Sequence, residues 1–145
     1  MRIYLDNCCY NRPYDDQSQT RIHLEAQAKM QIKQMIKNQE IELVTSYILE
    51  YENEKNHSLS KKQSINHFIY NYATYHIDIN HDNEIVTIAE PIMLTGIKQQ
   101  DAYHVACAIL AECNYFITVD DRLLKYQTKE MPLITPIDFI NKWRN

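Results

Sequence analysis

Short apolar runs alternate with longer helical segments along the whole chain, and this alternation limits the fold more than any other feature. The apolar runs are typical of buried strands, and they cover residues 2–6, 41–46, 75–79, 115–121 and 131–135. Strands that are separated by helices require right-handed crossovers and a mostly parallel sheet with helices on both faces. The sequence therefore predicts an α/β fold, and its length of 145 residues indicates one domain over residues 1–145.

The segments between these runs favour helices. They cover residues 17–38, 47–55, 60–75, 83–96, 98–114, 121–126 and 136–143. The segment 60–75 is amphipathic, and the segment 98–114 is strongly apolar. At least one helix thus follows each strand, as the crossovers of a parallel sheet require.

Composition excludes several classes of protein. The single glycine, Gly96, excludes the glycine-rich phosphate loops of Walker and dinucleotide-binding proteins. A net charge of −4 argues against a strongly electrostatic nucleic-acid binder, unless several of the acids bind cations. No pair of the four cysteines has C-x-x-C spacing, so we expect reduced thiols. No apolar run could span a bilayer and no signal peptide is recognisable, so we expect a cytoplasmic protein without a membrane partner.

Acidic residues directly follow two of the expected strands. Asp6 ends the first apolar run, and Asp120 and Asp121 end the fourth. In open α/β sheets, functional groups gather at the carboxyl ends of the strands. Further acids begin the strongly apolar helix or lie directly after the second strand, and these are Asp101, Glu50 and Glu52.

Carboxylates that gather in this way repel one another and raise one another's pKa values. A hard divalent cation between them relieves the repulsion, and Mg²⁺ and Mn²⁺ prefer such oxygen ligands. One or two such ions can activate a water to attack phosphorus, in line with the departing 3′ oxygen of a phosphodiester. Each acid also has an ordinary structural interpretation, as a turn residue, a helix cap, a first-turn charge or part of a solvated helix face.

Taken in order, the acidic motifs resemble those of the PIN-domain nucleases. The matching stretches span nearly the whole chain, and they are IYLDN, TSYILEYE, DAYHVACA, ITVDD and PLITPIDFI. The resemblance implies a three-layer α/β/α sandwich with a mostly parallel five-stranded sheet, and a Mg²⁺- or Mn²⁺-dependent ribonuclease. It also implies a site that contains Asp6, one glutamate, Asp101 and Asp120, with Thr118 positioning the metal-held water or Asp120.

Glu50 and Glu52 are alternatives for the glutamate of this site, because residues two apart point about 200° apart on a helix. The spacing that is usual in the family, counted from Ser46, favours Glu52, whereas a shorter turn would bring in Glu50.

Three basic residues lie near these acids in the sequence. Arg12 and Arg21 follow the first strand, and they either contact substrate phosphate or lie in a solvated loop. His104 lies one turn after Asp101 on the same side of the helix, where a packed histidine is favoured over a catalytic one.

The resemblance implies hydrolysis of single-stranded or structured RNA without a protein nucleophile. Many small nucleases of this family are toxins that a partner neutralises, so we expect an RNA substrate, an antitoxin protein and a homodimer. The alternative is a catalytically idle scaffold of the same fold that binds RNA or protein. A phosphatase of the haloacid dehalogenase type is disfavoured because it needs a second Asp where Cys8 stands. A receiver domain is disfavoured because Asp6-Asn7 and Lys125 do not match its pattern.

Overall fold

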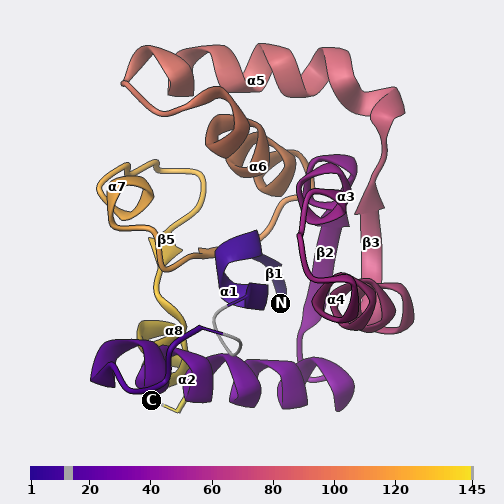
Figure 1. Cartoon of the computed structure of the whole chain (residues 1–145). Helices are drawn as coiled ribbons and strands as arrows, with labels where there is room; N and C mark the ends of the chain where they lie inside the picture. Colours follow the sequence, from indigo (N-terminus) through magenta and orange to yellow (C-terminus); the bar gives the residue numbers. More distant parts are fainter. Residues whose placement is uncertain (12–14, 145) are drawn as a thin grey trace.

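Five parallel strands form one sheet in the computed structural model, which describes residues 1–11 and 15–144 (Figure 1). The strands are β1 (Arg2–Leu5), β2 (Glu42–Ser46), β3 (Ala73–Ile77), β4 (Tyr115–Ile117) and β5 (Leu133–Ile134). Their order is β3-β2-β1-β4-β5, and every neighbouring pair is parallel. The predicted α/β class is therefore confirmed, with a sheet that is wholly parallel among the described residues.

Helices connect the strands at nearly all the predicted places. They are α1 (Asn7–Asn11), α2 (Thr20–Lys37), α3 (Tyr47–Glu54), α4 (Leu59–Tyr72), the 3-10 turn η2 (Ile79–His81), α5 (Asp82–Leu94), α6 (Gln99–Leu110), α7 (Asp121–Leu124) and α8 (Pro136–Arg144). The sequence did not predict α1 or η2, because such short elements show no apolar period. It also extended the helix before β3 to residue 75, whereas the backbone becomes extended at Ala73, where β3 begins to pair with β2.

Hydrophobic side chains pack in two clusters, one on each face of the sheet. Alternate strand residues supply them, so that Ile3 and Leu5 point to one face and Tyr4 points to the other. The first cluster includes residues of α1, α2, α4 and α8, and the second includes residues of α5, α6 and α7. Figure 1 shows α2 and α8 below the sheet and α5 and α6 above it. The molecule is thus a three-layer α/β/α sandwich, as expected.

The strand order changes direction at β1, which has β2 on one side and β4 on the other. In open parallel sheets, the crevice outside the carboxyl ends of the strands at such a point is the usual place for a ligand. Asp6 directly follows β1, and Thr118 directly follows β4. The fold therefore brings both residues to this crevice.

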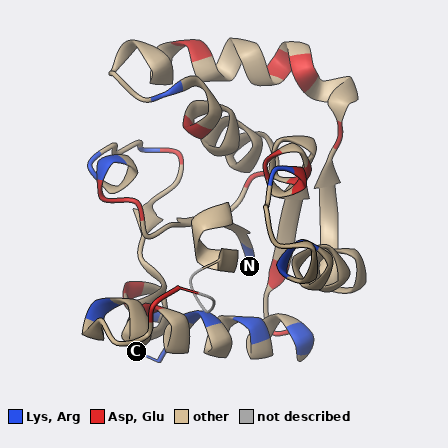
Figure 2. Cartoon of the chain, viewed as in Figure 1, with Lys and Arg blue, Asp and Glu red and all other residues tan. Residues whose placement is uncertain are grey.

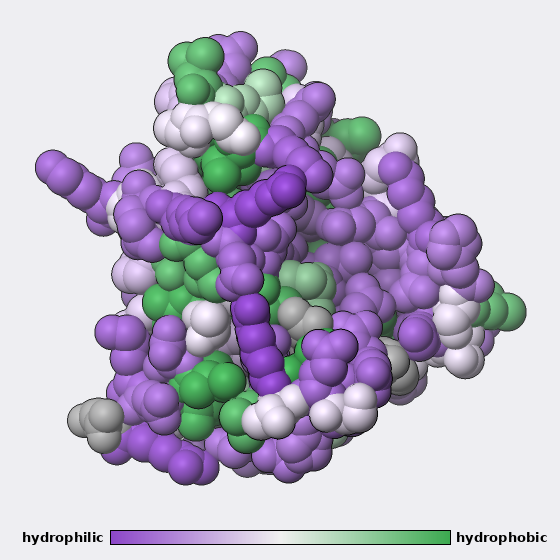
Figure 3. All heavy atoms as spheres, turned by 60° about the vertical axis from the view of Figure 1, so that its left-hand side comes forward, coloured by the Kyte–Doolittle hydropathy of each residue, from purple (hydrophilic) through white to green (hydrophobic). Residues whose placement is uncertain are grey.

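The surface is largely polar where it can be seen. Figure 3 shows one face on which hydrophilic residues predominate and hydrophobic residues form small separate groups. No helix within residues 1–11 and 15–144 has both the length and the apolar character needed to cross a membrane.

We predict that Leu43→Ala destabilises the protein by about 2–5 kcal/mol, because Leu43 is fully buried in β2 and its loss leaves a cavity. Urea unfolding of both proteins measures this difference. Leu94→Ala is the matched control, because Leu94 is 88% exposed at the end of α5 and its loss should change stability by less than about 0.5 kcal/mol. Equal effects of the two substitutions would contradict the packing described here.

Candidate active site

Asp6 is a buried carboxylate at the carboxyl end of β1. Its backbone N–H donates to the carbonyl of Ile117 at 2.9 Å, which continues the pairing of β1 with β4 by one residue. Its Oδ1 accepts from the backbone N–H of Asn7 at 2.8 Å, and its Oδ2 accepts from the Thr118 hydroxyl at 2.8 Å. Asp6 is only 5% exposed, so these bonds replace hydration that the carboxylate has lost.

Thr118 joins the ends of β1 and β4. Its hydroxyl donates to Asp6 and accepts from the backbone N–H of Asp120 at 3.1 Å. Asp120 in turn caps α7, because its Oδ1 accepts from the backbone N–H of Arg122 at 2.9 Å. Asp120 therefore serves as the helix cap and also stands next to the site.

Glu52 is held at the crevice by His104. The α3 helix begins at a fixed place because the Ser46 hydroxyl caps it, accepting from the backbone N–H of Leu49 at 3.1 Å. Glu52 Oε2 then lies 2.5 Å from His104 Nε2. On the other side of the imidazole, Nδ1 lies 2.6 Å from the Tyr4 hydroxyl, which lies 2.6 Å from Ser46 Oγ. A continuous row of hydrogen bonds thus connects α3, α6, β1 and β2.

The row of hydrogen bonds favours a charged His104–Glu52 pair. Burial lowers the pKa of His104, but the hydrogen bond to Glu52 and the nearby charges of Asp6 and Asp101 raise it above its ordinary value overall. Burial raises the pKa of Glu52, but hydrogen bonds from His104, Gln100 and Asn7 lower it overall. An imidazolium donates from both nitrogens, so His104 donates to Glu52 and Tyr4, and Tyr4 then donates to Ser46.

Asp101 lies in the first turn of α6 and faces the other acids. Its pKa is raised by burial and by the negative charges of Asp6 and Asp120, more than the charge of His104 lowers it. Asp101 and Asp120 also line one cavity, whose volume is about 250 Å³. Asp6, Asp120 and Glu52 therefore all act electrostatically on Asp101, as carboxylates around a cation site do.

The donor atoms fit a divalent cation. Asp6, Glu52 and His104 each place one potential ligand atom within 4.8 Å of the others, the only such group among the described residues. Because His104 bonds to Glu52 and Tyr4, we assign the ligand role to the carboxylate oxygens and the orienting role to the imidazole. Oxygen donors with mutual repulsion suit Mg²⁺ or Mn²⁺.

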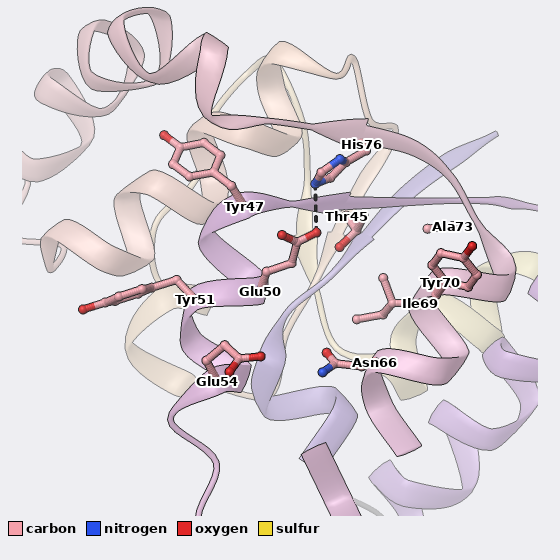
Figure 4. A pocket seen from close by; sticks show the side chains of 10 residues that line it. All are labelled: Thr45, Tyr47, Glu50, Tyr51, Glu54, Asn66, Ile69, Tyr70, Ala73 and His76. Carbon is pink, nitrogen blue, oxygen red and sulfur yellow. Dashed lines mark ion pairs between the residues drawn. The ribbon is translucent and has the colours of Figure 1, made fainter. Parts of the chain in front are cut away.

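Glu50 points to a different part of the molecule from Glu52. Its Oε1 lies 3.0 Å from His76 Nε2 on β3, and both line a cavity of about 630 Å³ between α3, α4 and β3. Figure 4 shows this pair beside the buried Thr45. The structure therefore brings Glu52, and not Glu50, to the end of β1.

The structure describes one of the two arginines that the sequence singled out, Arg21. Arg21 forms a two-pronged ion pair with Asp121, at 3.0 and 2.8 Å, and also contacts Glu25 at 3.3 Å. A phosphate would have to share this guanidinium with two carboxylates. Arg12 lies outside the described residues.

The sequence left open the contacts of Asn7 and Cys8, the two residues that follow Asp6. Cys8 is a free thiol in α1, and its Sγ lies 3.4 Å from both Asp6 Oδ2 and the Thr118 hydroxyl. Asn7 contributes to holding Glu52. The only signal was their position directly after Asp6, because α1 is too short to show which of its faces meets the site.

Comparison with known proteins supports the fold. No family model and no curated protein sequence matches the chain. The crystal structure of VapBC2 from Rickettsia felis, bound to a DNA fragment from its promoter, matches 92% of this chain and 97% of its own chain, with 15% identity and a TM-score of 0.55. The structure of FitAcB from Neisseria gonorrhoeae matches 93% of this chain and 98% of its own, with 17% identity and a TM-score of 0.57. The chain thus has a PIN-like fold.

We predict that Asp101→Asn stabilises the metal-free protein at neutral pH, because it removes a charge that is partly buried and repelled by the other carboxylates. The pKa of Asp101 is raised on folding, so the wild type loses stability as the pH rises through that pKa. The advantage of the variant should therefore vanish in acid and grow toward neutral pH. Urea unfolding in EDTA at acidic and neutral pH measures it.

Glu90→Gln is the control for this prediction, since Glu90 is an exposed acid on α5. Its effect on unfolding should be small at both pH values. A loss of stability in Asp101→Asn at neutral pH would show that Asp101 is not repelled by the other acids.

We predict that His104→Gln lowers the free energy of unfolding by about 2 kcal/mol, because it breaks a hydrogen bond between charged groups. The pKa of His104 is raised on folding, so its contribution falls as the pH rises through that pKa. The pKa of Glu52 is lowered, so its contribution falls as the pH falls through that pKa. The loss should be largest between about pH 4.5 and 6.5, the ordinary pKa values of the two groups. Unfolding curves across pH measure it, and a loss that is independent of pH would contradict the charged pair.

Proposed function

We propose that this protein is an endoribonuclease that depends on Mg²⁺ or Mn²⁺ and hydrolyses phosphodiester bonds of single-stranded or structured RNA. One observation carries the proposal: Asp6 and Glu52 offer carboxylate oxygens within 4.8 Å of each other at the carboxyl end of β1, and their charges, with that of Asp120, act on Asp101 nearby. Figure 2 shows acidic residues on α3, at the start of α6 and where the chain enters α7 after β4. Gathering so many carboxylates is unfavourable unless a cation is bound there.

Asp6, Glu52, Asp101 and Asp120 would hold the metal. When bound, one or two such ions supply an activated water and stabilise the leaving oxygen. Other residues of the site position these carboxylates. Thr118 fixes the orientation of the Asp6 carboxylate through its hydrogen bond, and it ties Asp120 to the end of β4.

Two further features support hydrolysis without a protein nucleophile. The Thr118 hydroxyl donates its proton to Asp6 and is buried, so it is not available to attack a substrate. His104 is 1% exposed and bonded on both nitrogens, so it orients Glu52 rather than moving protons to or from a substrate.

The similar structures support a proposal for the biological setting. VapBC2 and FitAcB are PIN-domain toxin–antitoxin complexes. We propose the same role here, with a toxin in the cytoplasm, an antitoxin protein that covers the acidic site, and a homodimer as the assembled state. Arg12 and Arg21 stay proposed phosphate contacts, and Arg21 would have to exchange its bond to Asp121 for one to substrate.

The proposal predicts that purified wild type cleaves a mixed pool of single-stranded RNA with Mg²⁺ or Mn²⁺ and is inactive in EDTA. Asp101→Asn should lose at least about a hundredfold in rate, because it removes a charged ligand of the cation. Glu50→Gln is the matched control, since Glu50 bonds to His76 away from the site and should keep normal activity. Gel analysis of labelled RNA measures all three.

The outcomes separate the proposed enzyme from its alternative. Folded wild type that binds no Mn²⁺ in calorimetry and cleaves no RNA would favour a catalytically idle scaffold. Loss of activity in Glu50→Gln and not in Glu52→Gln would reverse the assignment of the glutamate.

A further inference from the structure

We infer that two basic pockets on opposite sides of the acidic site bind the RNA phosphates that flank the cleaved one. This inference rests on the proposed function and extends it to the path of the substrate. The first pocket, called the α4 pocket, is lined by Asn7, Glu52, Lys55, His57 and Lys61, among others. The second, called the α7 pocket, is lined by Lys98, Asp101, Asp120 and Arg122, among others.

The α4 pocket begins at the acidic site itself, because Glu52 forms part of its wall. Its volume is about 390 Å³, and Lys55 and His57 are exposed side chains on it. Lys55 stacks over the Tyr51 ring at 4.3 Å. Tyr51 lines the neighbouring cavity and not the α4 pocket, so we assign the phosphate contact to Lys55 alone.

The amino end of α4 adds to the positive character of the α4 pocket. Ser58 caps this helix of 14 residues and also lines the pocket. The positive end of the helix dipole therefore points to the same space as Lys55 and Lys61. Two independent sources of positive potential thus meet beside Glu52, where an anion would be stabilised.

The α7 pocket lies on the other side of the acids. Asp101 and Asp120 form its wall toward the site, and Lys98 and Arg122 are exposed on it. Figure 2 shows basic residues in the segment before α6 and in α7. Among the ion pairs between described residues, none involves Lys55, Lys98 or Arg122.

Each pocket has acids of the site in its wall, Glu52 in the α4 pocket and Asp101 and Asp120 in the α7 pocket. This arrangement fits a polyanion that crosses the site. RNA is repelled by four carboxylates, so its affinity must come from the bound cation and from basic groups nearby. A strand whose neighbouring phosphates occupy the α4 and α7 pockets would place the phosphate between them over Asp6 and Glu52. The net charge of −4 hides this local pattern, because most acids lie elsewhere.

Paired charge-removing variants test the two pockets. Lys55→Gln/Lys61→Gln alters the α4 pocket, and Lys98→Gln/Arg122→Gln alters the α7 pocket. Lys129→Gln/Lys142→Gln is the control that removes the same charge outside both. We expect each pocket variant to lose about tenfold in kcat/KM on a short RNA, mainly through KM. The slope of log(kcat/KM) against log[salt] should also become shallower by about 0.7 for each phosphate that the variant no longer binds.

Shortened substrates identify which pocket binds which side of the cut. Oligonucleotides are trimmed from one end or the other, relative to the mapped cleavage position. Trimming one end should no longer matter in the α4 variant, and trimming the opposite end should no longer matter in the α7 variant. Pocket variants that match the control variant in KM and in salt slope would overturn the inference. The inference would also be overturned if trimming the same end of the RNA removed the KM effect of both pocket variants.

A failure of the proposed function gives a different result. Wild type that does not cleave RNA with Mn²⁺ would refute the nuclease, and the path is then tested by binding. In that case, fluorescence anisotropy with a labelled single-stranded RNA should show weaker binding by both pocket variants than by the control. Equal binding by all three would overturn the path as well. Thermal unfolding of each variant verifies that its fold is intact.

Discussion

The hydrogen bonds of the Tyr4 hydroxyl organise the centre of this molecule. Tyr4 is fully buried in the middle strand and stacks on Phe116, so its hydroxyl must find partners inside the protein. Burial raises the pKa of this hydroxyl, which therefore keeps its proton. Its two partners are Ser46, which caps the start of α3, and His104, which forms a hydrogen bond to Glu52. Through one hydroxyl, the core thus determines both where α3 begins and where its glutamate points.

A second constraint is the repulsion among the acids. Hydrogen bonds and an opposite charge offset this repulsion to a different extent at each acid. Asp6 is almost completely buried, but it accepts from Asn7, Thr118 and Cys8. Glu52 is compensated by an imidazolium. Burial and the negative charges of the other acids raise the pKa of Asp101, and the charge of His104 offsets this only in part. The site therefore stores unfavourable electrostatic energy that a bound cation would release, which links metal binding to stability.

The sequence was sufficient to predict the fold and the segments that supply the acids, because both depend on patterns that are local in the chain. An apolar run that ends in Asp6 shows a strand and its carboxyl end together. The choice between Glu50 and Glu52 depends on the rotation of α3, which is set by contacts from His104 and His76, far away in sequence. No local pattern carries that information. The same holds for Arg21, whose pairing with Asp121 joins residues 100 positions apart.

Net charge is a poor guide to nucleic-acid binding for a protein built in this way. Carboxylates at the crevice make the total more negative, but a bound divalent cation would offset two of their negative charges. Basic residues then matter by position rather than by number. Lys55 and Lys61 stand beside Glu52, and Lys98 and Arg122 stand beside Asp101 and Asp120. On the proposed path, a polyanion would meet positive charge on both sides of the acids, so a chain with an acidic total could still hold RNA there.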